Sequence, residues 1–206
     1  MQFDQKMLSE VFADFCNQVL LQKYHFGDEQ HYEQIREPLE NNGCNPFIET
    51  EADYKIKLGS FLENRLWTNG ITVHSEMARI YKHPKFSHSR PDLTLHIKSK
   101  DWLKECDREQ SLKCVIELKG ANVLDPYAAF KPSTYHNISY DISKLGSLPS
   151  ILIRCLVFLD EALRVGKPCN RISEDGGKQY IENFITEATR AGVIVLSNNP
   201  LLNVFP

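Results

Sequence analysis

Hydrophobic and polar residues alternate in two short segments near the middle of the chain, residues 92–98 and 113–119. The apolar positions of one face are Leu93, Leu95 and Ile97 in the first segment and Cys114, Ile116 and Leu118 in the second. A period of two is typical of a β-strand with two different faces. The opposite faces carry Asp92 in one strand and Glu117 and Lys119 in the other, so we expect two acids and a lysine at one edge of a sheet. The polar residues 99–111 between the strands indicate a hairpin excursion.

Two earlier segments have the period of a helix, with apolar residues three or four positions apart. They are Leu8, Val11, Phe12, Phe15, Val19 and Leu20 in the first, and Tyr54, Leu58, Phe61, Leu62 and Leu66 in the second, which Thr50 would cap. Each set forms one apolar stripe at 100° per residue. We predict an N-terminal helical extension over residues 1–45 and a main domain over residues 46–206, with a turn at residues 41–46.

Shorter patterns predict the remaining elements. They are a strand over residues 71–78, an irregular loop over 121–137, a short helix over 137–146, a buried strand over 150–159, a helix over 175–190 and a last strand over 193–197. A strand, a helix and a strand in succession indicate a crossover connection. The whole pattern predicts a mixed sheet with helices, in the α/β class.

Composition limits the classes of function. The chain has 206 residues, enough for one domain with a sizeable core. It shows no apolar run of about 18 residues and no basic-then-apolar start, so we expect no transmembrane helix, no signal peptide and a cytoplasmic location. Its six cysteines form no C-x-x-C pair, which argues against a zinc ribbon or an iron–sulfur cluster. We expect Cys114 and Cys155 to be buried free thiols.

The net charge of −3 argues against a protein that grips nucleic acid with its whole surface. Basic residues are concentrated locally, in residues 79–90, where no acid is present. Because this segment leads directly into Asp92, we expect Lys82, Lys85 and Arg90 to contact phosphates beside the acids. The alternative is an ordinary solvated loop.

The paired acids indicate a metal site. Carboxylates on neighbouring strands can share a hard divalent cation such as Mg²⁺, which takes oxygen ligands. Such a cation supplies a water nucleophile at neutral pH and stabilises charge on a phosphoryl group. Lys119 would lie on the same side, where an ammonium group can position the water or offset the charge of a pentavalent transition state.

Pro91-Asp92, followed 25 positions later by Glu117-Leu118-Lys119 at the end of a hydrophobic strand, resembles the signature of the PD-(D/E)XK nuclease superfamily. The resemblance covers residues 50–160 and includes the order of the elements. It implies a restriction-endonuclease-like αβββαβ core and a Mg²⁺-dependent endonuclease, with Mn²⁺ as a possible substitute. The implied substrate is nucleic acid, which in this superfamily is usually DNA, with RNA left as the alternative, and the implied setting is prokaryotic defence, restriction or repair.

The same resemblance assigns roles to single residues. Asp92, Glu117 and the Leu118 carbonyl would bind the metal, and Lys119 would act on the attacking water. Glu51, at the start of a core-facing stripe, matches the acid that many families carry on the first helix; a metal or a lysine would pair it. The alternative explanation for Glu51 is an acid at the helix N-terminus that the helix dipole stabilises. Glu63 is the other candidate for the acid on this helix, but we expect it to face solvent.

Three further residues are accessory candidates. Glu76 would add a carboxylate to the site or pair with Lys119, unless it is an ordinary residue on a strand face. In the helix after the Glu-x-Lys strand, Lys144 is expected to contact a phosphate and Asp141 to be a structural partner. A solvated helix face is the alternative for both.

A second function stays open at this point. A nuclease-like fold without catalysis can serve as a module that binds nucleic acid or protein. The N-terminal helices would then form the partner surface, and they are also where a homodimer or a partner protein would attach. This alternative predicts that binding survives substitution of Asp92, Glu117 and Lys119.

Overall fold

The computed structural model describes residues 3–20, 51–98, 109–121, 132–160 and 177–206. Its centre is a five-stranded sheet with the strands in sequence order. The strands are β1 (Ile71–Ser75), β2 (Leu93–Ile97), β3 (Leu112–Ala121), β4 (Ile153–Asp160) and β5 (Ile194–Ser197). β2 pairs antiparallel with both β1 and β3, whereas β4 pairs parallel with both β3 and β5. The predicted mixed sheet of the α/β class is therefore confirmed.

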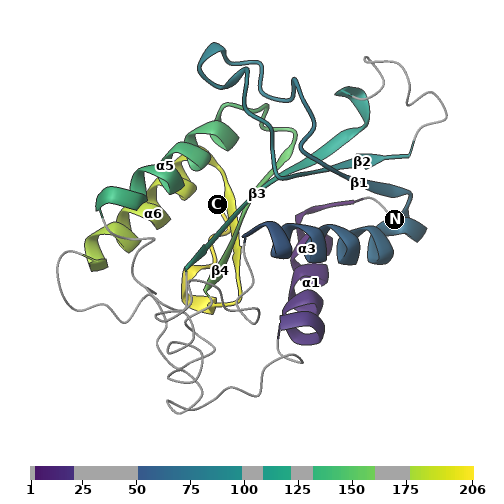
Figure 1. Cartoon of the computed structure of the whole chain (residues 1–206), viewed down its shortest axis with the longest axis horizontal. Helices are drawn as coiled ribbons and strands as arrows, with labels where there is room; N and C mark the ends of the chain where they lie inside the picture. Colours follow the sequence, from purple (N-terminus) through teal and green to yellow (C-terminus); the bar gives the residue numbers. More distant parts are fainter. Residues whose placement is uncertain (1–2, 21–50, 99–108, 122–131, 161–176) are drawn as a thin grey trace, which may run out of the picture.

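Helices cover both faces of the sheet (Figure 1). One face carries α1 (Gln5–Phe15), which a π-helical turn (Cys16–Leu20) continues, and α3 (Glu51–Leu66). The other carries α5 (Pro132–Gly146) and α6 (Gly177–Ala191). The 3-10 turns are η2 (Trp67–Asn69), η3 (Pro84–Phe86) and η7 (Pro200–Leu202). None of the helices in the described residues is long and apolar enough to cross a membrane.

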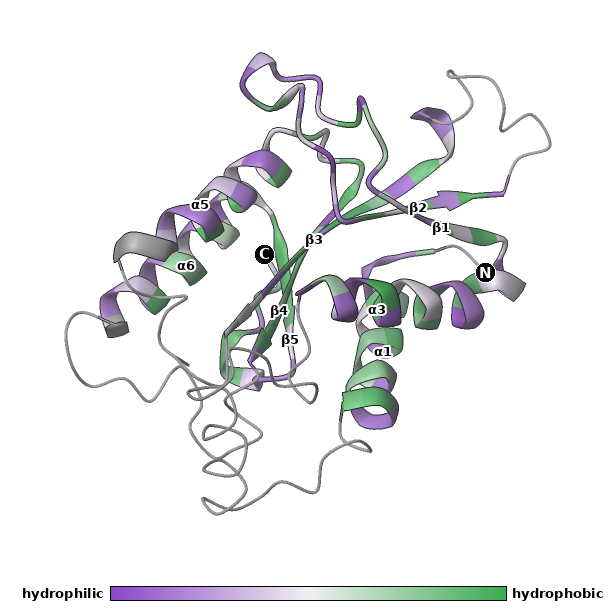
Figure 2. Ribbon diagram, viewed as in Figure 1, coloured by the Kyte–Doolittle hydropathy of each residue, from purple (hydrophilic) through white to green (hydrophobic). Residues whose placement is uncertain are grey.

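Alternate residues of β3 enter two separate cores. Cys114, Ile116 and Leu118 pack with the apolar stripe of α3 and with α1. Val115 packs instead with residues of α5 and α6. The same division applies to β4, where Leu156 and Phe158 enter one core and Cys155, Val157 and Leu159 enter the other. Because both faces of this stretch are buried, residues 155–159 are all apolar (Figure 2). Cys114 and Cys155 are buried free thiols, as predicted.

The predicted stripes of both early helices are confirmed. Leu8, Phe12 and Phe15 of α1 are buried, and so are Tyr54, Leu58, Leu62 and Leu66 of α3. The two helices contribute to one core together with the sheet. The predicted boundary near residue 45, the turn at residues 41–46 and the Thr50 cap lie outside the described residues.

Several predicted bounds are wrong, each for a local reason. β1 ends at Ser75 rather than residue 78, because Glu76 has a left-handed φ of 51° that breaks the strand. α5 begins at Pro132 rather than residue 137, since a proline is well suited to the first turn of a helix. β4 begins at Ile153, and Ile151 before it is 89% exposed. Residues 99–108 of the predicted hairpin excursion, and residues 122–131 of the predicted loop, are not among the described residues.

The two edge strands both have polar groups that are satisfied within the chain. The Glu63 carboxylate accepts a hydrogen bond from the backbone N–H of Val73 in β1. The prediction that Glu63 faces solvent is therefore wrong. At the other edge, Val195 of β5 forms an antiparallel bridge with Val204. Each contact occupies a backbone group at the sheet edge that a strand from another molecule would otherwise pair with.

Candidate active site

The strand register brings the two signature acids together. β2 and β3 pair Leu93 with Ile116, so Asp92 lies beside Glu117 one step further along the antiparallel pair. The Asp92 side chain also bonds to β3, since its Oδ2 accepts a 2.8 Å hydrogen bond from the N–H of Leu118. The Glu76 N–H donates to the Pro91 carbonyl at 3.1 Å and closes the base of the connection that we call loop 76–91.

A chain of alternating acids and lysines starts at Glu117 and crosses the end of the sheet. Lys144 Nζ lies 2.9 Å from Glu117 Oε1 and 2.8 Å from Asp141 Oδ1. The other oxygen of Asp141, Oδ2, lies 3.2 Å from Lys119 Nζ. Lys119 Nζ also lies 3.2 Å from Glu51 Oε1 at the start of α3. Helices from both layers therefore meet the Glu-x-Lys strand at one place.

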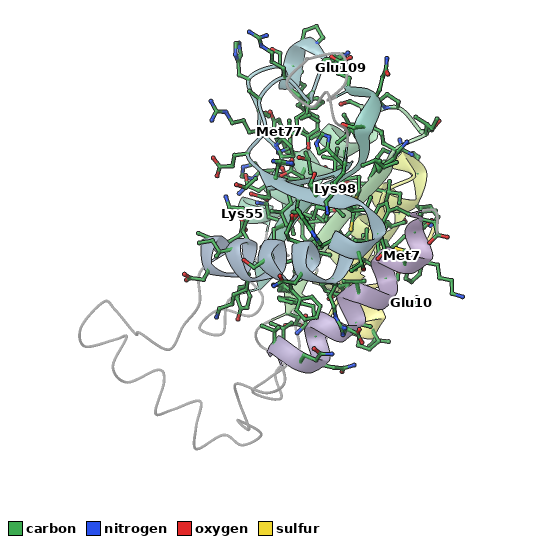
Figure 3. The ribbon with its side chains drawn as sticks, turned by 90° about the vertical axis from the view of Figure 1, so that its right-hand side faces the viewer. Met7, Glu10, Lys55, Met77, Lys98 and Glu109 are labelled. Atoms are coloured by element: carbon green, nitrogen blue, oxygen red, sulfur yellow. The ribbon has the colours of Figure 1, made fainter. Side chains whose placement is uncertain are left out.

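A second group of charges lies on the α3 side of the same strand end. Lys55 Nζ lies 2.6 Å from Glu76 Oε1 and 3.6 Å from Asp92 Oδ1. In Figure 3, Lys55 of α3 lies between that helix and Met77, which is at the start of loop 76–91. Lys55 thus joins the helix, the loop and the first signature acid.

Glu117 is the most deeply buried of these acids, with 3% of its surface exposed. Burial raises its pKa to about 7, and the nearby Asp141 carboxylate adds to the effect. Lys144 opposes the shift, and so does the Tyr81 hydroxyl, which donates a hydrogen bond to Glu117 Oε1. A carboxyl group with this pKa changes its charge near neutral pH.

The lysines of the cluster remain ammonium groups at neutral pH. Burial alone would lower the pKa of Lys119, but the Asp141 and Glu51 carboxylates outweigh burial and raise it. The same balance, set by Glu117 and Asp141, raises the pKa of Lys144. Lys119 is therefore suited to orienting a water or offsetting negative charge, and poorly suited to accepting a proton.

The residues present fit a divalent cation by charge and by ligand type. The two groups of paired side chains at this strand end, which we call the acid cluster, together comprise five carboxylates and three ammonium groups, so the fully ionised cluster carries two excess negative charges. Carboxylate oxygens are the ligands that Mg²⁺ prefers. In the part of the chain that the structure describes, no three acids, histidines or cysteines already form a group that could hold a metal ion. Each acid is paired with a lysine instead, so a cation would have to compete with those lysines.

Every catalytic and accessory candidate from the sequence lies in this cluster. They are Glu51, Glu76, Asp92, Glu117, Lys119, Asp141 and Lys144. Glu76 pairs with Lys55 and not with Lys119, and it follows the strand rather than lying on its face. Asp141 and Lys144 are only 5% and 6% exposed, so a solvated helix face is wrong for both. Lys144 lies inside the acid cluster rather than on an open phosphate-binding surface.

The predicted basic segment forms most of loop 76–91, which stands above the sheet in Figure 1. Lys82, Lys85 and Arg90 are all exposed. Lys82 Nζ lies 2.7 Å from Glu109 Oε2, and Figure 3 shows Glu109 at the top of the molecule. Lys85 and Arg90 are consequently the better candidates for phosphate contacts.

Two residues at the site were not predicted. Lys55 lies one helical turn after Glu51, and this i,i+4 spacing is a signal that places it on the same face of the helix. Tyr81 lies in an irregular loop without any periodic pattern. Its burial, to 1% exposure, depends on how loop 76–91 folds back over the sheet.

Comparison with known proteins adds no relative. A scan against models of protein families, a search of curated proteins and a search of solved structures found no match. The case for a function therefore depends on the residues and their geometry.

Proposed function

We propose that this chain is a metal-dependent nuclease that hydrolyses phosphodiester bonds, with DNA as its substrate. The observation that carries the proposal is the convergence of Asp92, Glu117 and Lys119 at one strand end, beside an exposed basic loop. The order of elements from α3 to β4, one helix, three strands, a helix and a strand, is that expected of a restriction-endonuclease-like core. We assign the chain to that fold as part of the same proposal.

The residues divide the chemistry between them. Lys119, held by Asp141 and Glu51, would orient the attacking water and offset the charge that develops on the phosphoryl oxygens. Lys85 and Arg90 would hold phosphates of the substrate next to the site. Lys144 and Tyr81 fix the orientation of Glu117, because each contacts its Oε1.

Asp92 and Glu117 are the residues that would hold the divalent cation. When bound, the cation would supply a nucleophilic water at neutral pH and stabilise charge on the phosphoryl group. The charge excess of the cluster supports this role for the two acids.

The test is a cleavage assay on supercoiled plasmid, linear duplex, single-stranded DNA and RNA, each with Mg²⁺, with Mn²⁺ and with EDTA. Wild type is compared with Lys119→Ala and Asp92→Asn, and with Lys6→Ala as a control on the exposed surface of α1. We expect EDTA to abolish cutting. Each site variant should reduce it at least about a hundredfold, whereas Lys6→Ala should cut like wild type.

The proposal fails if folded wild-type protein binds no divalent metal and cuts none of these substrates. It also fails if cutting persists in both site variants, since the activity would then come from another site or from a contaminant. Circular dichroism of each variant establishes that loss of activity is not loss of fold.

A further inference from the structure

Tyr140 is an exposed aromatic side chain beside the candidate active site. It lies on α5, four residues before Lys144, and is 38% exposed. Because residues four apart share one face of a helix, the Tyr140 ring is on the same side of α5 as the lysine that contacts Glu117.

The Tyr140 ring connects the acid cluster to loop 76–91. Lys144 Nζ lies 5.8 Å from its centre, and Lys85 Nζ lies at the same distance. The buried Phe86 ring meets it edge-on, with the centroids 5.2 Å apart and an interplanar angle of 80°. An edge-to-face contact with a buried ring restricts the orientation of Tyr140. The site thus has an aromatic ring of fixed orientation between the buried ammonium group of Lys144 and the exposed ammonium group of Lys85.

We propose that Tyr140 is the stacking platform for an unpaired base of single-stranded DNA, and that Lys85 binds the phosphate next to that base. This inference rests on the proposed nuclease function and names its preferred substrate. An aromatic side chain beside cationic groups is the usual arrangement for binding single strands, since every base has a flat face that can stack. In a duplex that face is already covered by the neighbouring base pairs.

The experiment measures binding by fluorescence anisotropy, in the Lys119→Ala background with Mg²⁺ so that the probe is not cut. The probes are a labelled single-stranded oligonucleotide and the same sequence as a duplex. Tyr140→Ala is compared with Tyr140→Trp and with His136→Ala, an exposed position one turn earlier on α5. We expect Tyr140→Ala to weaken single-strand binding about tenfold or more, and duplex binding less than twofold. Tyr140→Trp and His136→Ala should bind like the background protein.

A second measurement separates stacking from a general effect on the surface. A set of single strands, each with one abasic nucleotide at a different position, is bound to proteins with and without Tyr140→Ala. In the protein that keeps Tyr140, an abasic nucleotide at one position of the strand should weaken binding by a factor similar to the effect of Tyr140→Ala on the intact strand. In the Tyr140→Ala protein, the strand with the abasic nucleotide at that position should bind as tightly as the intact strand.

Equal effects on single strands and duplex, or no effect on either, would overturn the inference. If the wild type cuts DNA while binding is indifferent to Tyr140, only this inference fails. If the wild type cuts no nucleic acid and no probe binds, the proposed function fails with it.

Discussion

The charge of the Glu117 carboxyl group depends on two opposing influences. Burial among the strands favours the neutral acid, whereas Lys144 and the Tyr81 hydroxyl favour the carboxylate. Without a cation, burial outweighs Lys144 and Tyr81, with the nearby Asp141 carboxylate adding to its effect, and it raises the pKa of Glu117 to about 7. A bound divalent cation would add a strong preference for the charged form. Metal binding and proton release at Glu117 are therefore expected to be coupled.

The raised pKa of Glu117 predicts a pH-dependent stability. Between the ordinary value of 4.5 and the folded value of about 7, the folded state holds a proton that the unfolded state has lost, so stability falls as pH rises. In EDTA, the free energy of unfolding of wild type should fall relative to that of Glu117→Gln by about 3 kcal/mol between pH 4.5 and pH 8. Urea titrations at several pH values measure this difference.

A control variant, Glu10→Gln on the exposed surface of α1, should follow the pH dependence of wild type. Parallel curves for wild type and Glu117→Gln would show that Glu117 titrates normally. Mg²⁺ should reduce the loss of stability at high pH, because it favours the carboxylate of the folded state.

Tyr81 should tune the pH range in which metal binds. Its hydroxyl favours the charged form of Glu117, so Tyr81→Phe should raise the pKa of that acid. We expect the midpoint of Mn²⁺ binding, followed by calorimetry as a function of pH, to move to higher pH. Tyr135→Phe alters another buried tyrosine, which packs against Tyr180, and should leave the midpoint unchanged. An identical midpoint in Tyr81→Phe would contradict the coupling.

The elements show which features the sequence could predict. The period of two in β2 and β3 was sufficient to place Asp92, Glu117 and Lys119, because each strand has only two faces. The stripe of α3 was equally clear. The contact of Glu63 with Val73 was not predictable, since a helical stripe gives a direction but not the neighbouring backbone. The end of β1 was not predictable either. Glu76 has a left-handed φ that ends the strand, although the alternating pattern predicted that the strand continues.

The end of α6 gives a prediction about stability. Gly192 has a φ of 63°, and the N–H of Val193 bonds the Ala188 carbonyl at 2.9 Å, as in a helix that ends with a left-handed glycine. A methyl group at Gly192 would be strained and would also meet the Arg154 guanidinium. Gly192→Ala should therefore lower the free energy of unfolding by about 1–2 kcal/mol, as measured by urea titration.

Thr189→Ala is the matched control, one turn earlier on the exposed side of the same helix. It removes a side chain without changing the backbone conformation, so we expect a change within about 0.5 kcal/mol. The proposed nuclease activity should survive in both variants, since neither residue belongs to the acid cluster. Equal stability of Gly192→Ala and wild type would show that the left-handed conformation is not required.

The distribution of charge over the molecule limits how it could bind the proposed DNA substrate. A net charge of −3 gives no general attraction for a polyanion, so binding has to depend on local groups. Loop 76–91, which carries exposed basic residues, begins at Glu76 of the acid cluster, whereas Lys6, the basic residue of α1, pairs with Glu10 on that helix. If the proposed function holds, a basic loop beside the acid cluster should hold the nucleic acid in one orientation, with a phosphate directed at Lys119.

This arrangement makes the salt dependence of binding diagnostic. Each phosphate contact releases counterions, so removing one should reduce the slope of log K against log salt by about 0.7 for single strands. In the Lys119→Ala background, Lys85→Ala and Arg90→Ala should each reduce the slope by about this amount, and Lys82→Ala by less, because Lys82 is paired with Glu109. Lys6→Ala, on α1, should leave the slope unchanged. If all four lysine and arginine variants had the same slope, the charge of the whole surface and not loop 76–91 would hold the DNA.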